Sequence, residues 1–272
     1  MKTQTATAVA HPNIAFIKYW GNRDAFLRLP ANGSLSMNLE ELHTRTTVDF
    51  NTAYSEDSLI INGKHVSGAS LERVQTFLDL VRKIAGQRVC AAVESDNNFA
   101  SGAGIASSAS AFADWSLAAT AALGIQLNDK ELSSLARRGS GSACRSIPSG
   151  FVEWRAGDSD LNSYAFSIAP QDHWNLVDLV AIVNCEHKPV GSTEGHALAD
   201  TSPLQIARVT DAPRRITICR QAILEKNFQA LTEIIELGNH MMHAVMMTSR
   251  PSLMYWQSGT IAIMQHVKKW RE

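Results

Sequence analysis

The most informative segment of this sequence reads Ser101-Gly102-Ala103-Gly104-Ile105-Ala106-Ser107-Ser108-Ala109-Ser110. Gly102 and Gly104 allow backbone conformations that other residues avoid, and they leave space for a ligand to come close. The Ala-rich residues 109–123 favour a helix, and Gly124 stands where a left-handed residue ends one. A glycine turn that leads into a helix presents free N–H groups and the positive end of the helix dipole. The segment therefore predicts an anion site.

Three serines of this segment add to the prediction without deciding it. The hydroxyls of Ser107, Ser108 and Ser110 suit phosphate oxygens or a Mg²⁺ ion. The Walker pattern is absent, since no Gly-Lys-Ser/Thr sequence follows. By composition alone, a flexible turn before a core helix is an equally good interpretation. The choice between the two depends on the rest of the chain.

The predicted elements are segregated along the chain. Strands are expected at residues 5–10, 44–50, 58–61 and 88–94, with a hairpin turn at Asn62-Gly63. Helices are expected at 71–84, 109–123 and 128–138. Strands at 151–154, 164–168 and 177–184 follow, and then helices at 203–209, 214–225, 228–248 and 252–270. Because strands dominate the first part and helices the last, the sequence predicts an α+β protein in two lobes that meet near residues 170–178.

The composition excludes several classes of protein. Of the 272 residues, 45% are hydrophobic and 19% charged, which is ordinary for a globular protein. The formal net charge of −1 argues against a nucleic-acid partner, and the apolar stretches are too short or too polar to span a bilayer. The four cysteines form no Cys-x-x-Cys pair, and His240 and His243 have no evident third ligand, so they predict no metal site. Residues 1–10 contain no signal-peptide core, which makes a cytoplasmic protein the expectation.

Three further blocks are informative through their length and order. They are Asn13-Ile14-Ala15-Phe16-Ile17-Lys18-Tyr19-Trp20-Gly21-Asn22-Arg23-Asp24, Arg138-Gly139-Ser140-Gly141-Ser142-Ala143-Cys144-Arg145-Ser146, and Gly191-Ser192-Thr193-Glu194-Gly195. Taken singly they are weak, because Tyr19 suits a core and Arg145 suits a surface ion pair. Lys18 is a better hint, since a lysine in an apolar run needs a reason to be buried. Ser140 and Ser142 beside glycines are typical of a second anion-binding nest.

These blocks together resemble a known family. Residues 104–109 resemble the phosphate loop of the GHMP kinase superfamily, and the three blocks resemble the mevalonate diphosphate decarboxylases in order and over nearly the whole chain. The resemblance implies a two-lobed GHMP-kinase fold. Its ATP- and substrate-binding lobe, residues 1–174, would be ribosomal-protein-S5-domain-2-like. Its second lobe, residues 175–272, would be helix-rich, ferredoxin-like and incomplete.

The resemblance also implies an activity and roles for single residues. The activity is ATP-dependent decarboxylation of mevalonate 5-diphosphate or 5-phosphate by a homodimer that uses ATP and Mg²⁺. Arg145 would hold the C1 carboxylate with its planar guanidinium, Asn13 would brace Arg145, and Lys18 would complete the catalytic set. The phosphorylated end of the substrate would be lined by Lys18, Tyr19, Trp20, Ser140, Ser142 and Ser192. The nucleotide would be held by Asn97, Gly102, Gly104, Ser107, Ser108 and Ser110, with Ser107 as the Mg²⁺ contact.

The sequence departs from the family pattern at three positions. Ala100 stands where the phosphate-loop motif begins with Pro, and His196 stands where a basic residue or Met often follows the third block. Asn22 stands where the family has a Lys beside the substrate diphosphate. Loss of a cation near the terminal phosphate weakens diphosphate binding most. The hypothesis that follows is a preference for mevalonate 5-phosphate.

The catalytic Asp of the family is not found in this sequence. It lies in an Asp-Ala-Gly-Pro-Asn segment expected after the helix at 252–270, and the sequence ends at Glu272 before it. Asp200 and Asp211 lie in no matching motif. The chain is therefore expected to be part of a longer protein. Two alternatives to the decarboxylase remain open: a small-molecule kinase such as a mevalonate 3-kinase, and a catalytically inactive ATP-binding protein.

Overall fold

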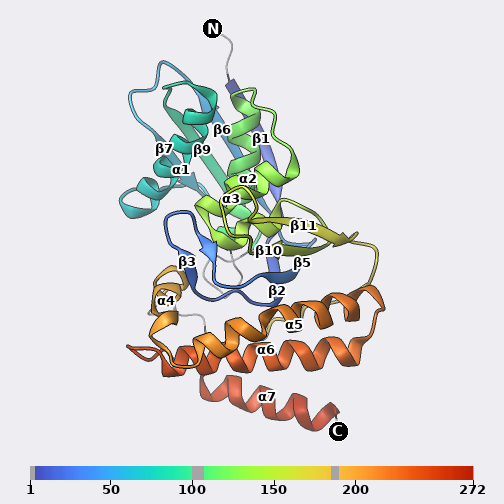
Figure 1. Cartoon of the computed structure of the whole chain (residues 1–272). Coiled ribbons are helices and arrows are strands. Elements are labelled where there is room, and N and C mark those ends of the chain that lie inside the picture. Colours follow the sequence, from blue (N-terminus) through green and yellow to red (C-terminus); the bar gives the residue numbers. More distant parts are fainter. Residues whose placement is uncertain (1–3, 100–106, 185–189, 272) are drawn as a thin grey trace.

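The computed structural model describes residues 4–99, 107–184 and 190–271 (Figure 1). Gly102 and Gly104, two of the predicted nucleotide contacts, lie outside the described residues. Within these ranges the chain forms two large sheets with helices packed against them. No helix in the described ranges is long and apolar enough to cross a membrane.

The first sheet has five strands in the order β1-β6-β9-β7-β8. Their bounds are Gln4–Ala10 for β1, Thr44–Phe50 for β6, Ser58–Ile61 for β7, Lys64–His65 for β8 and Ala91–Asn97 for β9. β7 runs parallel to β9, and the other pairs are antiparallel. Asn62 and Gly63 have φ angles of 49° and 72°, the left-handed conformation that the predicted hairpin turn requires.

Helices α1 (Ala69–Ala85), α2 (Ser107–Ala122) and α3 (Asp129–Gly139) cover this sheet. α2 lies across β1 and β6, and its side chains are buried around most of its circumference. Val48, Phe77 and Trp115 belong to the apolar core between the sheet and these helices. Because α2 is held on several sides, its first turn is fixed directly after the glycine loop.

The second sheet is four-stranded and antiparallel, in the order β11-β10-β5-β2. Its strands are β2 (Asn13–Ile17), β5 (Ser34–Asn38), β10 (Phe151–Arg155) and β11 (Tyr164–Ala169), and a hairpin of β3 (Asn22–Asp24) and β4 (Leu29–Pro30) follows β2. Helices α5 (Gln205–Leu224) and α6 (Phe228–Thr248) pack beneath this sheet, and α7 (Ser258–Arg271) lies beyond α6 (Figure 1). The shorter elements are the 3₁₀ helices η1 (Gly141–Ser146) and η2 (Ala199–Thr201) and helix α4 (Ser192–Leu198).

Two sequence predictions about the elements are wrong. Residues 177–184 form no strand, and Val177 and Leu179 are exposed. A strand needs a hydrogen-bonding neighbour, and this segment pairs with no sheet in the described part of the chain. The predicted helices 203–209 and 214–225 are one helix, α5, with Pro213 inside it. Burial of side chains such as Ile216 and Ile223 against the second sheet offsets the roughly 3 kcal/mol that a proline inside a helix costs.

Candidate functional site

Arg145 lies at the centre of the candidate site, on η1 beside strands β2 and β5. Its side chain is 3% exposed. Its Nε donates to Ser36 Oγ at 3.1 Å and its Nη1 to Ser34 Oγ at 2.5 Å, both on β5. Among the described residues it forms no ion pair, and burial lowers its pKa from the ordinary value for an arginine. A buried guanidinium held by neutral oxygens suits an incoming carboxylate.

Asn13 on β2 fixes the orientation of Arg145. Its Oδ1 accepts from Arg145 Nη2 at 2.9 Å and from Nε at 3.2 Å. Its Nδ2 donates to the Ser142 carbonyl at 3.1 Å and to Ser146 Oγ at 2.8 Å, which sets the direction of the amide. The structure thus brings Asn13 and Arg145 together as the sequence analysis required. Their catalytic roles stay a prediction.

An aromatic stack lies next to the serines of η1. The ring of Tyr19 is stacked on His196 at a centroid distance of 4.3 Å and meets Trp154 edge-on at 4.7 Å. A Cβ atom on Gly141 would lie 2.2 Å from the Tyr19 hydroxyl, so that hydroxyl lies directly against the backbone between Ser140 and Ser142. Burial raises the Tyr19 pKa to about 12, with Arg145 opposing this, and the phenol therefore stays protonated. It can donate a hydrogen bond to an anion.

Trp20, another predicted contact, is 6% exposed and packs with Met242 and Leu253 of the C-terminal helices. Its ring is also 4.5 Å from that of His196. Lys18 is partly buried at the end of β2. Trp20 therefore packs against the C-terminal helices, and the predicted ligand contacts of Lys18, Tyr19 and Trp20 stay predictions.

The serines predicted to meet the nucleotide divide into two groups. Ser107 and Ser108 are partly buried in the first turn of α2, and Ser108 Oγ lies 3.3 Å from Ser140 Oγ. The helix N-terminus and the nest at residues 140–142 thus adjoin. Ser110 is fully buried: its hydroxyl accepts from Thr44 Oγ1 at 2.6 Å and donates to the Ser107 carbonyl at 3.2 Å. Its hydroxyl is thus bonded to the protein, and its predicted contact with phosphate stays a prediction.

Two other predicted contacts lie at the edges of the site. Asn97 ends β9, where its Oδ1 accepts from Thr44 Oγ1 at 2.7 Å. Its side chain is partly exposed, so a nucleotide contact remains open to it. Ser192 is exposed at the start of α4, one turn before His196. Its contact with the substrate stays a prediction.

Sequence reasoning missed cations that the fold brings to this site. Arg73 on α1 donates from Nη2 to the Gly139 carbonyl at 2.9 Å, next to Ser140. Burial lowers its pKa to about 10, with Arg28 adding to the effect. The charge of Arg28 opposes the rise in the Tyr19 pKa. Arg28 lies in the β3–β4 turn, where its φ is a left-handed 50°. Arg28 and Arg73 lie outside the three sequence blocks. Their positions follow only from how α1 and the β3–β4 hairpin pack.

A carboxylate was missed as well. Desolvation by neighbouring groups raises the pKa of Asp178, although the residue is exposed, and the charge of Lys18 opposes that shift. Asp178 lies in the segment 177–184, which the sequence predicted to be a strand. The described residues contain no cluster of three or more His, Cys, Asp or Glu side chains suited to a metal ion.

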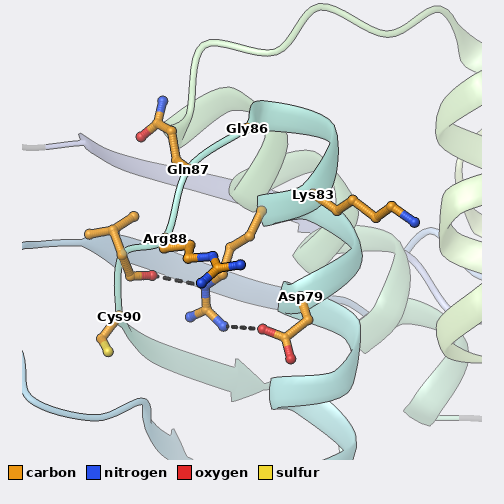
Figure 2. A pocket seen from close by; sticks show the side chains of 8 residues that line it. Asp79, Lys83, Gly86, Gln87, Arg88 and Cys90 are labelled. Carbon is orange, nitrogen blue, oxygen red and sulfur yellow. Dashed lines mark hydrogen bonds and ion pairs between the residues drawn. The ribbon is translucent and has the colours of Figure 1, made fainter.

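A cavity of about 600 Å³ lies elsewhere, between the C-terminal end of α1 and the start of β9 (Figure 2). Arg82, which projects into it, is paired with Asp79 at 2.8 Å and with Asp57. Its Nε also donates to the Val89 carbonyl at 2.8 Å. The charge of Arg82 is therefore balanced by carboxylates, whereas Arg145 forms no ion pair with the described residues.

Two family models match the chain. Residues 10–165 match the diphosphomevalonate decarboxylase-like N-terminal domain, and residues 178–272 match the mevalonate 5-diphosphate decarboxylase C-terminal domain. A diphosphomevalonate decarboxylase of Bos taurus is 36% identical over 97% of this chain and 70% of its own length. A phosphomevalonate decarboxylase of Haloferax volcanii is 35% identical over 98% of this chain and 81% of its own length.

Solved structures resemble the chain over almost its whole length. The mevalonate diphosphate decarboxylase of Staphylococcus aureus has a TM-score of 0.93 at 38% identity, covering 99% of this chain and 82% of its own. A structure described as MDDEF in complex with MVAPP, AMPPCP and magnesium has a TM-score of 0.92 at 38% identity, covering 99% and 83%. This likeness confirms the predicted GHMP-kinase fold.

Proposed function

Since the chain belongs to the diphosphomevalonate decarboxylase family, we propose that it catalyses the ATP-dependent decarboxylation of a 5-phosphorylated mevalonate. The observation that carries this proposal is the environment of Arg145. Its buried guanidinium is oriented by Asn13 and two β5 serines, and it has no ion-pair partner among the described residues. Loss of CO₂ requires the carboxylate to be held in one orientation, and a buried guanidinium fixed by three neutral side chains can hold it so.

The residues around the start of α2 fit a nucleotide phosphate. The first turn of α2 presents free backbone N–H groups, and Ser107 and Ser108 carry hydroxyls beside Ser140. In the proposal Ser107 meets Mg²⁺, while Ser108 and Asn97 meet ATP. Bound ATP would supply the phosphoryl group that turns the C3 hydroxyl into a leaving group. The acceptor-activating Asp remains an expectation from the family, and no described residue is assigned that role.

The chain's own residues would hold the two ends of the substrate. Arg145 orients the carboxylate for departure as CO₂, and the neutral Tyr19 phenol donates to the phosphorylated end. Ser140, Ser142 and Ser192 add hydroxyls there, and Lys18 adds positive charge. These groups act by position and charge, which is the main contribution a protein makes to phosphoryl transfer.

We further propose that mevalonate 5-phosphate is preferred over the diphosphate. Asn22 supplies no charge where the family has a Lys, and its Oδ1 is buried without a hydrogen-bond partner among the described residues. The Haloferax volcanii relative, a phosphomevalonate decarboxylase, shows that the family includes enzymes named for the monophosphate. The loss of one charge-assisted contact corresponds to roughly 1.5–3 kcal/mol, or about tenfold to a hundredfold in kcat/KM.

The decisive experiment follows CO₂ from mevalonate 5-phosphate and 5-diphosphate labelled at C1, with ATP and Mg²⁺ present. Trapped CO₂ together with ADP supports the proposal, and a higher kcat/KM for the monophosphate supports the preference. ADP and a doubly phosphorylated product without CO₂ would establish the kinase. ATP binding without turnover of either substrate would establish a binding protein. Sedimentation equilibrium tests the expected homodimer.

A further inference from the structure

Three side chains from the C-terminal helices bind the backbone of residues 18–21, the segment that carries Lys18 and Tyr19. Gln205 Nε2 donates to the Trp20 carbonyl at 2.7 Å. Arg208 Nη2 donates to the Lys18 carbonyl at 2.7 Å, and its Nη1 to the Trp20 carbonyl at 3.3 Å. From α4, His196 Nδ1 accepts from the Gly21 N–H at 3.0 Å. We call His196, Gln205 and Arg208 the backbone clamp.

The clamp fits the segment closely. Gly21 has a φ of 92°, and a Cβ atom there would lie 2.5 Å from Gln205 Nε2. Asn32 extends the contacts, since its Nδ2 donates to the Lys18 carbonyl at 3.1 Å and its Oδ1 accepts from Arg208 Nη1 at 3.0 Å. The carbonyls and the amide on this side of the segment are therefore bonded to side chains from distant parts of the chain.

Burial of the charged Arg208 side chain costs free energy that apolar packing alone does not explain. It is 1% exposed, and it forms no ion pair among the described residues. Its neighbour Arg215 pairs with Asp211 at 3.0 Å, so the carboxylate of Asp211 balances the charge of Arg215 and not that of Arg208. Burial and the charge of Arg215 lower the Arg208 pKa to about 9. A buried cation bonded only to neutral oxygens indicates that the contacts it makes with the segment matter.

His196 combines a hydrogen bond with aromatic packing. His196 is buried, its ring packs against those of Tyr19 and Trp20, and burial lowers its pKa to about 3, with Arg208 and Arg28 adding to the effect. Since the ring is neutral and Nδ1 accepts from Gly21, the proton lies on Nε2. His196 therefore fixes both the Tyr19 ring and the Gly21 backbone.

We propose that His196, Gln205 and Arg208 are positioning residues, which set the conformation of residues 18–21 and thereby the place where Lys18 and Tyr19 meet the phosphorylated end of the substrate. The part concerning substrate rests on the proposed function. The part concerning the backbone does not. Residues of the C-terminal helices would thus determine substrate affinity without touching the substrate.

Two substitutions of His196 separate its two contacts. His196→Phe keeps an aromatic ring for stacking but removes the Nδ1 acceptor, whereas His196→Asn keeps an acceptor near Nδ1 but removes the ring. Gln205→Leu removes the donor to Trp20 at similar size. Exposed controls are His65→Phe on β8 and Gln221→Leu on α5.

Hydrogen exchange of the peptide that contains residues 18–21 is measured first, and then the KM values. His196→Phe and Gln205→Leu are expected to speed exchange about tenfold, as for the loss of one hydrogen bond, with His196→Asn and both controls near the unsubstituted rate. In the first two variants KM for phosphorylated mevalonate should rise about tenfold, while KM for ATP stays within about twofold.

Unchanged exchange in folded His196→Phe would overturn the clamp. Faster exchange with an unchanged substrate KM would overturn its role in positioning, and so would an equal rise in the KM for ATP. If the unsubstituted protein releases no CO₂, the proposed function fails. Hydrogen exchange then still tests whether the backbone clamp fixes residues 18–21, because that measurement does not require the protein to convert a substrate.

Discussion

Asn13→Asp is the sharpest test of the Arg145 site, because it places a carboxylate where Arg145 now contacts an amide. The change is nearly isosteric. The introduced oxygens would replace Oδ1, which accepts at 2.9 Å and 3.2 Å, and would give Arg145 an internal counter-charge. The substituted site would therefore already hold the carboxylate that the substrate is proposed to bring.

The magnitude follows from these contacts. Giving the two bonds from Arg145 an ionised acceptor as well as an ionised donor adds about 1–2 kcal/mol of stability, whereas loss of the Nδ2 donors to Ser142 and Ser146 costs about 2 kcal/mol. The melting temperature should therefore move by less than about 5 °C. A substrate carboxylate about 5 Å from the new charge is repelled by about 3 kcal/mol at an effective dielectric constant near 20, so kcat/KM should fall about a hundredfold.

The assay is CO₂ release at varied substrate concentration, with a thermal melt of each variant. Asn227→Asp is the matched control, because Asn227 Oδ1 caps α6 by accepting from the Ala230 N–H at 3.0 Å, and an aspartate caps equally well. The control should keep full activity. A kcat/KM for Asn13→Asp within threefold of the unsubstituted value would refute a carboxylate site at Arg145. A fall of more than about 10 °C in the melting temperature would show that Asn13 acts mainly in folding.

Three further changes test other parts of the site. Arg145→Ala should lower kcat at least a hundredfold and leave the ATP Kd within about threefold, and an equal loss of both would make Arg145 structural. Asn22→Lys should raise kcat/KM for the diphosphate about tenfold relative to the monophosphate, as steady-state kinetics with both substrates will show. Burial raises the Asp114 pKa well above its ordinary value, so the folded protein holds this proton more tightly than the unfolded chain, and its stability falls as the pH rises above the unfolded pKa of about 4. The free energy of unfolding of Asp114→Asn in urea, relative to that of the unsubstituted protein, should therefore be higher at pH 8 than at pH 4. An identical difference between the two proteins at both pH values would contradict the burial argument.

Elements with strong local signals could be predicted from the sequence. β6 was expected at residues 44–50 and α6 at 228–248, and the structure has both at these bounds. Asn128 caps α3 through a capping box with Glu131, as its position before the helix predicts. The segment 177–184 failed because its apolar pattern says nothing about whether a pairing strand is present. The division of the chain into residues 1–174 and 175–272 stays a prediction.

The candidate site was predictable where recognisable sequence blocks contain its residues, and not where only helix packing brings the residues together. Asn13 and Arg145 come from two recognisable blocks, and they meet at 2.9 Å. Spacing alone could not tell that Ser110, unlike Ser107 and Ser108, is the fully buried serine of its helix turn. Arg73 and Arg208 belong to helices whose apolar patterns predict packing only, and their contacts with the site depend on how those helices lie.

The buried arginines differ in how their charges are balanced. Among the described residues, four arginine side chains are almost fully buried, namely Arg137, Arg145, Arg208 and Arg215. Arg137 pairs with Asp160 and Arg215 with Asp211, so their charges are balanced within the protein. Arg145 and Arg208 form no ion pair with the described residues, but Arg208 spends its hydrogen bonds on the carbonyls of residues 18 and 20, whereas Arg145 is held only by neutral side chains. Leaving the charge of Arg145 unbalanced costs folding free energy that a bound carboxylate would recover. A substrate that carries a carboxylate meets that requirement, whereas a ligand without one leaves Arg145 uncompensated.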